Sequence, residues 1–224
     1  MDLSAHWRGH LLLFGPRVAP ALAMKPARRL LLAFLILEGL IGPRFELLKI
    51  LGLAQPASWV RIAILLALAL LMVRLLARVS WREIGFIPWR EWSLAEKSYF
   101  LQVVAIGSVA GLLLLGPRLR PEAFLTALAW GFYQELVYRG ILQTALVSRM
   151  GAIAGILVAN VLFTFGPLHF YYFFQKPVPV GMFAAIFAIG LFFAALFHRS
   201  GNLWIVATFH GIGTAFILGA MGSP

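Results

Sequence analysis

The sequence predicts an all-α protein, a polytopic transmembrane helical bundle of about seven spans. Hydrophobic residues make up 62% of the 224 residues and charged residues only 12%, about half the share usual in soluble domains. The mean hydropathy is +0.90. The apolar residues come in long runs, and roughly 20 of them cross a bilayer as a helix. Because lipid offers the backbone no hydrogen-bond partner, such runs must be helical.

Seven apolar stretches are candidates for membrane-spanning helices. In chain order they are residues 29–43, 59–79, 98–116, 123–148, 151–169, 180–198 and 202–221. The first is short, and the fourth contains several polar residues. The fifth is expected to kink or end near Pro167, because proline lacks a backbone donor and clashes with the preceding turn. The sixth has no charge over residues 180–197, and only His210 interrupts the seventh.

The chain is expected to form one membrane domain over residues 29–224, preceded by an interfacial arm at residues 1–28. The longest polar connection, residues 78–97, mixes Trp with Arg and Glu, a composition typical of linkers in the lipid headgroup region. The chain contains no cysteine, which excludes a disulfide framework and a Cys-based metal site.

The net charge of +11 does not indicate nucleic-acid binding, because Lys and Arg are spread along the chain at the ends of the predicted spans. With seven spans, the loops on one side carry Lys25, Arg28, Arg29, Arg74, Arg78, Arg82, Arg90, Lys97, Arg149 and Arg199. The other side carries Arg44, Lys49, Arg61, Arg118, Arg120 and Lys176. The positive-inside rule therefore predicts that the first side is cytoplasmic.

Five ionisable residues lie inside the predicted spans: Glu38, Glu135, Arg139, His169 and His210. Each costs about 2.5–3.5 kcal/mol to insert even on the lenient scale. Such side chains tend to face the interior of the bundle, where they pair or take part in function.

Glu135 and Arg139 are four residues apart with Glu first, the order that favours an ion pair on one helix face. The pair either holds the fourth helix in register or belongs to a site. Gln134 lies about 100° around the helix from Glu135 and is expected to share a face with Tyr138.

His169 is expected at a broken helix end, and His210 well inside the last span with Thr214 one turn further on the same face. Two His and one carboxylate can activate water for hydrolysis. The same set is also a known pattern for catalytic zinc. Composition does not choose between these two possibilities.

Three segments together resemble the CPBP family of intramembrane proteases, which includes type II CAAX prenyl endopeptidases and bacterial Abi proteins. They are QELVYRG (134–140), FGPLH (165–169) and RSGNLW (199–204), the last followed by His210. The similarity covers roughly residues 80–215, with WREIGF near its start.

The family pattern begins with two adjacent Glu, which fall on Gln134 and Glu135, followed by an Arg, which falls on Arg139. In the family, the first Glu and the first His are thought to activate the attacking water. Gln cannot accept a proton as a general base. Three interpretations stay open: an introduced Glu→Gln change, transfer of the base role to Glu135, or a natural non-catalytic relative.

The family's Phe-three-residues-His motif falls on Phe165 and His169, and its final His falls on His210. The Asn that often follows four residues later, which would support the oxyanion, is replaced by Thr214. The resemblance thus implies catalytic positions at 134, 135, 169 and 210, with support from Arg139 and Thr214.

The implied activity is that of an intramembrane endopeptidase, a hydrolase cleaving near the C-terminus of a lipidated or hydrophobic membrane substrate. The alternative is a non-catalytic immunity or scaffold protein. Membrane lipids and a hydrophobic or lipidated peptide are the expected partners, and the bacterial inner membrane is the expected location. No cofactor is predicted, because Glu135 is expected to pair with Arg139, although two His and a carboxylate keep zinc possible.

Overall fold

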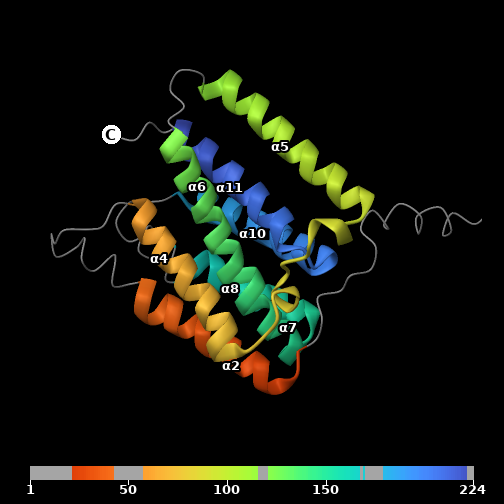
Figure 1. Cartoon of the computed structure of the whole chain (residues 1–224). Coiled ribbons are helices and arrows are strands. Elements are labelled where there is room, and N and C mark those ends of the chain that lie inside the picture. Colours follow the sequence, from red (N-terminus) through yellow and green to blue (C-terminus); the bar gives the residue numbers. More distant parts are fainter. Residues whose placement is uncertain (1–21, 43–57, 116–120, 167–168, 170–178, 221–224) are drawn as a thin grey trace, which may run out of the picture.

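The computed structural model describes residues 22–42, 58–115, 121–166, 169 and 179–220. This part of the chain forms seven continuous helices and contains no strand (Figure 1). They are α2–η1 (Met24–Phe34, Leu35–Ile41), α4–η2 (Ser58–Leu71, Met72–Ala77), α5 (Leu94–Leu115), α6–η6–α7 (Pro121–Glu135, Leu136–Gln143, Thr144–Met150), α8 (Ala152–Phe165), α10 (Val180–Ser200) and α11 (Leu203–Ala220). The predicted all-α fold is confirmed.

Each predicted span corresponds to one helix, with bounds shifted by a few residues. The fifth helix ends at Phe165, where Gly166 turns extended, as expected for a helix that approaches Pro167. Among the described residues, two helices are long and apolar enough to cross a membrane by themselves, Ser58–Ala77 and Val180–Ser200. Shorter apolar helices cover Ala152–Phe165 and Leu203–Phe216.

The expected interfacial arm lies mostly outside the described residues, and α2 begins at Met24. Its place at the membrane surface stays a prediction.

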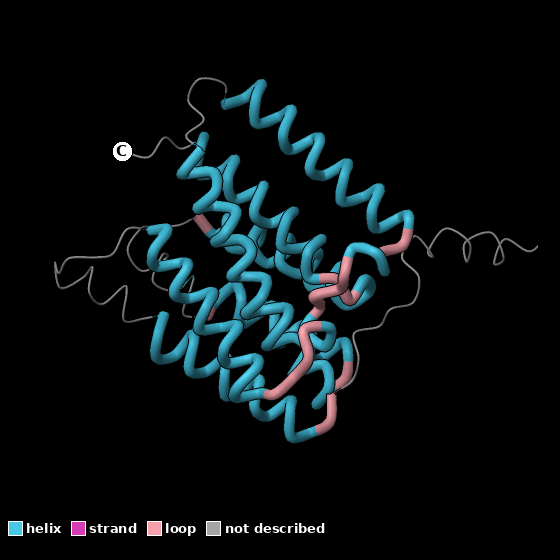
Figure 2. The backbone as a smooth tube through the Cα atoms, viewed as in Figure 1, coloured by secondary structure: helices cyan, strands magenta, loops and turns pink. Residues whose placement is uncertain are grey.

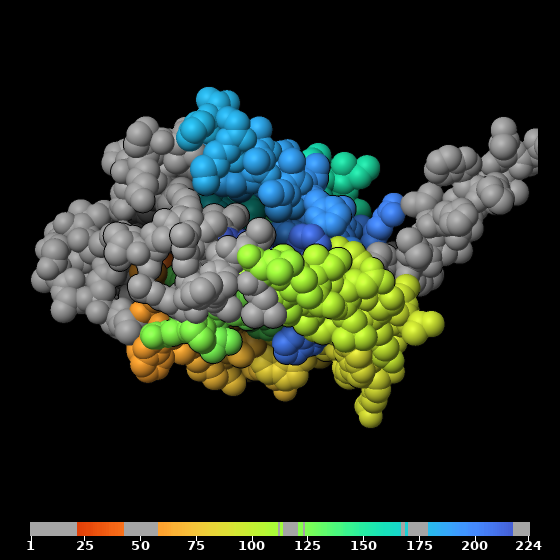
Figure 3. Space-filling model, turned by 90° about the horizontal axis from the view of Figure 1, so that it is seen from above, coloured from red at the N-terminus to blue at the C-terminus, as the bar shows by residue number. Residues whose placement is uncertain are grey.

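Successive helices run in opposite directions, so their ends gather at two ends of the bundle (Figure 1). Most of the described loops lie at one of these ends (Figure 2). The connection between α4 and α5 is there, with two 3₁₀ turns, Arg82–Ile84 and Trp89–Glu91. Seen from above, α10 (blue) and α5 (yellow-green) lie on opposite sides of the view (Figure 3), and α5 packs against α11.

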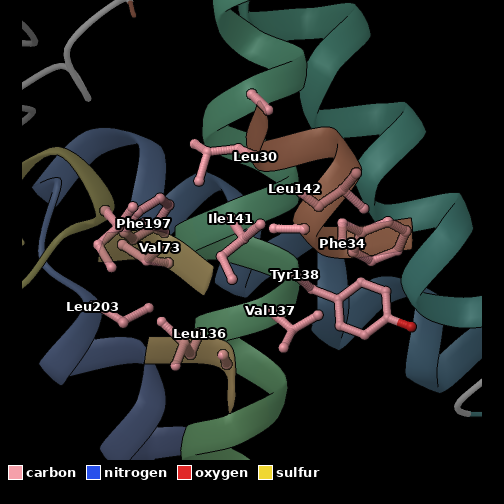
Figure 4. Close-up of a cluster of buried hydrophobic side chains, with 14 of the residues drawn as sticks. Leu30, Phe34, Val73, Leu136, Val137, Tyr138, Ile141, Leu142, Phe197 and Leu203 are labelled. Atoms are coloured by element: carbon pink, nitrogen blue, oxygen red, sulfur yellow. The ribbon is translucent and has the colours of Figure 1, made fainter. Parts of the chain in front are cut away.

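The hydrophobic core is built around η6, a π-helical segment whose eight residues are all buried. Side chains from α2, η2, α10 and α11 converge on it (Figure 4). The polar side chains of Tyr138, Arg139 and Gln143 are buried with the apolar ones. Because a buried polar group is costly without a partner, these side chains must find their partners inside the bundle.

Two glycines bring α6 and α11 into backbone contact beside the segment that holds Gln134 and His210. A Cβ added to Gly131 would lie 2.5 Å from the Cα and the nitrogen of Gly211. Such a close approach needs glycine on both helices, as is common where membrane helices pack. This helix crossing therefore places Gly211, next to His210, directly against α6.

Candidate active site

A cavity of about 700 Å³ lies between α6, α8, α10 and α11. The polar residues that line it are Gln134, His169, His210 and Thr214. The remaining wall is apolar and consists of Phe163, Met182, Ile186, Ala188, Ile189, Phe192, Phe193, Phe209 and Gly213. The expected convergence of positions 134, 169 and 210 is present. The large contribution of α10 is not expected from the sequence, because an uncharged apolar helix carries no signal that marks a cavity wall.

Glu135 lies behind the cavity wall and has no exposed surface. One carboxylate oxygen, Oε1, lies 2.7 Å from Nδ1 of His210 on α11. The other, Oε2, lies 3.3 Å from Nε of Arg139, close enough for an ion pair although the two atoms are not aligned as a hydrogen bond. The expected Glu135–Arg139 pair is therefore present. The bond to His210 is additional: the two helices were expected to meet at one cavity, but Glu135 was expected to pair with Arg139 and not with His210.

Arg139 is also fully buried, and three contacts fix its side chain. Besides the ion pair with Glu135, Nη2 donates a hydrogen bond of 2.9 Å to the carbonyl of Gly190 on α10. The guanidinium carbon lies 4.6 Å from the centre of the Phe163 ring on α8, in a cation–π arrangement. Arg139 thus ties together three helices and holds the Glu135 carboxylate in one orientation.

The imidazole of His210 contacts two aromatic rings as well as the carboxylate at Nδ1. The Phe193 ring stacks on it at 5.2 Å and the Phe163 ring meets it edge-on at 6.0 Å. An ionised carboxylate can only accept hydrogen bonds, so when Glu135 is ionised the proton of this bond lies on Nδ1. Nε2 is then the ring nitrogen that can accept a hydrogen bond, and the imidazole lines the cavity.

His169 is fixed by the end of α8. The last carbonyls of a helix have no partner within it, and Nδ1 of His169 donates to one of them, the carbonyl of Phe163, at 2.5 Å. The His169 ring also packs edge-on against the Phe163 ring at 4.8 Å. Both imidazoles therefore rest on the same phenyl ring.

A second buried polar cluster was missed by the sequence analysis. The carboxyl of Glu38 on η1 accepts hydrogen bonds from the hydroxyls of Tyr133, at 3.1 Å, and Tyr138, at 3.0 Å. The sequence named no specific partner for Glu38, and in the structure its partners are these two tyrosines. The Tyr138 ring meets Phe163 edge-on at 5.2 Å.

The π-helical segment explains this cluster. Residues five apart lie about 140° from each other around an α-helix, too far for Tyr133 and Tyr138 to reach one carboxyl group. The i→i+5 bonding of a π-helix widens the turn and brings them closer. The same widening is why Gln134 and Tyr138 do not share surroundings as expected: Gln134 lines the cavity and Tyr138 contacts Glu38.

Within the described residues, no three or more His, Cys, Asp or Glu side chains are grouped as metal ligands. Glu135 already has partners in His210 and Arg139.

One comparison with known proteins gives a match. Residues 116–216 match the family model described as type II CAAX prenyl endopeptidase Rce1-like. Over these residues the chain is similar to that family, which supports the resemblance of its motifs. No curated protein and no solved structure matches the chain.

That family is one of intramembrane proteases, and the all-helical architecture with its membrane-span candidates agrees with such a protein. The matched segment contains Gln134, Glu135, His169 and His210. Glu38 lies outside it, on a helix that the family match does not cover.

Proposed function

We propose that this chain is an intramembrane endopeptidase that hydrolyses a peptide bond near the C-terminus of a lipidated or hydrophobic membrane substrate. The observation that carries the proposal is the lining of the cavity. Polar groups from α6, the end of α8, and α11 share one cavity with a long apolar wall from α10. Ligand pockets are typically apolar with a few well-placed polar groups, and this arrangement fits an apolar chain whose peptide bond reaches the polar side.

In this proposal, position 134 faces the hydrolytic water, because Gln134 lines the cavity while Glu135 is buried behind it. His169 polarises the water, and Thr214 and His210 supply donors near the oxyanion. Glu135 and Arg139 fix the positions of the helices and of the His210 side chain. Gln134 lacks the proton acceptor that the family's first Glu would provide.

The experiment is to compare the chain with its Gln134→Glu variant on quenched fluorescent peptides, some ending in a farnesyl-cysteine CAAX sequence and some in an unmodified apolar sequence. Gln134→Glu should produce cleavage or raise it, because it supplies a carboxylate that can act as general base. Adding His169→Ala should abolish the gain. The matched control is Gln102→Glu, the same change at an exposed position on α5.

Absence of cleavage by every variant across the panel would reject the protease proposal. The second candidate, a non-catalytic immunity or scaffold protein, is favoured by one observation, the amide at position 134. It requires that Gln134→Glu leave the chain without peptidase activity.

A further inference from the structure

We infer that Glu135 and His210 form a catalytic dyad in which His210 is the general base, so that this chain hydrolyses peptides with Gln at position 134. The inference rests on the proposed function. It assigns to His210 a proton-accepting role in place of a donor role near the oxyanion.

Gln134, Glu135 and His210 differ in whether they can accept a proton from water in the cavity. Gln134 lines the cavity but cannot accept a proton. Glu135 can accept one, but it has no exposed surface and both its oxygens face other side chains. His210 lines the cavity and touches the buried carboxylate at once. The buried carboxylate of Glu135 can therefore influence a water molecule in the cavity only by way of the His210 imidazole to which it is hydrogen-bonded.

The bond to Glu135 sets the tautomer that the dyad requires. An ionised Glu135 accepts the Nδ1 proton, which leaves the lone pair of a neutral His210 on Nε2, and the imidazole lines the cavity. This is the arrangement in which a buried carboxylate orients a histidine base in hydrolases of unrelated fold. The 2.7 Å Nδ1–Oε1 distance is in the range of a charge-assisted bond.

Packing restricts the movement of the dyad. The His210 ring stacks on Phe193 and contacts Phe163 edge-on, and the contact of Gly131 with Gly211 fixes its helix against α6. The charged and titratable groups around His210 are Glu135 on α6, Arg139 on η6 and His169 beyond α8. Of these, the directly bonded carboxylate stabilises an imidazolium.

The reaction then balances without another reactant. Nε2 of His210 takes a proton as the water oxygen bonds to the peptide carbonyl carbon. The oxyanion accepts a hydrogen bond from the side-chain amide of Gln134, which has two N–H donors. As the carbonyl re-forms, the C–N bond breaks and Nε2 returns the proton to the leaving nitrogen. Glu135 does not take up the Nδ1 proton and acts as a positioning residue.

The test is a four-variant cycle on the same farnesyl-cysteine and apolar peptides: the chain, His210→Gln, Gln134→Glu and the double substitution. His210→Gln should lower cleavage by about 10²–10⁴-fold in the chain. In the Gln134→Glu background, where the introduced carboxylate accepts the proton, the loss should be about tenfold. A role of His210 that is only structural would give the same loss in both backgrounds and would overturn the inference.

The outcomes separate this inference from the protease proposal. Cleavage by Gln134→Glu but not by the chain would overturn the dyad and leave the protease proposal standing. Cleavage by neither would reject both. A second measurement does not depend on activity: ¹⁵N-histidine NMR in detergent should assign His210 to the Nδ1–H tautomer, and an Nε2–H tautomer would overturn the dyad. Loss of that signature in Glu135→Gln, with the His198 signal unchanged, should identify Glu135 as the positioning group.

Discussion

At the scale of single residues, Glu135 joins the buried polar contacts of α6, η6 and α11. Its two oxygens meet His210 and Arg139, and all the surface of its side chain is removed from solvent. Breaking a buried pair by removing one partner leaves an uncompensated buried charge. The same carboxylate therefore contributes both to the fold and to the orientation of the site.

We predict that Glu135→Gln lowers the free energy of unfolding by about 3 kcal/mol, the lower end of the range for breaking a buried pair. Arg139 keeps its bond to the Gly190 carbonyl and its contact with Phe163, which limits the loss. For a chain of this size, the melting temperature should fall by roughly 6–12 °C. Thermal unfolding in detergent measures it, with Glu122→Gln at the exposed start of the same helix as control. Equal melting temperatures for the two variants would contradict a stabilising role.

The Glu38 cluster gives a second residue-scale prediction. Tyr133→Phe and Tyr138→Phe each remove one hydrogen bond to the carboxyl group and should each cost about 1 kcal/mol. The double substitution leaves Glu38 without either donor and should cost more than the two single losses together. Denaturant titration of the four proteins measures the coupling. Additive losses would mean that the two hydroxyls do not share one buried acceptor.

At the scale of helices, the crossing of α6 and α11 positions the two halves of the site. Glu135 is on one helix and His210 on the other, and their bond spans a contact in which Gly131 meets the backbone of Gly211. Backbone at this distance leaves no space for a methyl group, and neither helix can yield locally as a flexible side chain would. The length of the Glu135–His210 bond is therefore set by two glycines.

We predict that Gly131→Ala pushes α6 away from α11. Overpacking of this kind usually costs about 1–3 kcal/mol, and here it should also lengthen the Glu135–His210 bond. The readouts are the melting temperature and the His210 ¹⁵N signal, both of which should change. Gly39→Ala is the matched control, because a Cβ there has no heavy atom within 4 Å and alanine favours the helix. Identical behaviour of the two variants would show that the crossing tolerates a side chain.

At the scale of the whole molecule, the charges are divided between the two ends of the bundle. One end carries ten basic residues. They lie at the starts of α2 and α5, at the ends of η2, α7 and α10, and in the Trp-containing segment between η2 and α5. These residues are Lys25, Arg28, Arg29, Arg74, Arg78, Arg82, Arg90, Lys97, Arg149 and Arg199. Among the described residues, the other end carries Arg61; the other basic residues assigned to it lie outside them. This distribution favours the first end as the cytoplasmic one.

We predict that Leu94 is on the cytoplasmic side and Val180 on the opposite side. Both begin a helix and both are 84% exposed, so they form a matched pair. Because the chain has no cysteine, single substitutions Leu94→Cys and Val180→Cys give labelling without background. In intact bacterial cells, a membrane-impermeant maleimide should label only Val180→Cys, and permeabilisation should expose Leu94→Cys. The reverse pattern would invert the orientation, and labelling of both in intact cells would contradict a bundle whose ends face opposite compartments.

The sequence by itself determined the number and order of the helices, because each apolar run must satisfy its own backbone hydrogen bonds in lipid. It also determined which polar residues belong to the interior, since ionisable groups in such runs cost several kcal/mol and rarely face lipid. The Glu135–Arg139 pair follows from local helix geometry alone. The cavity positions 134, 169 and 210 were predicted from the family resemblance, and the structure brings them to one cavity.

Only the tertiary structure decided the contacts between residues far apart in the chain. The Glu135–His210 bond depends on a glycine crossing, and the Glu38 cluster depends on a π-helical turn that displaces Tyr138 from its α-helical position. The apolar wall from α10 depends on where an otherwise uniform helix packs. Apolar patterning specifies that a helix is buried, but the partner of each buried group is set by the packing of backbones against one another, which no local spacing encodes.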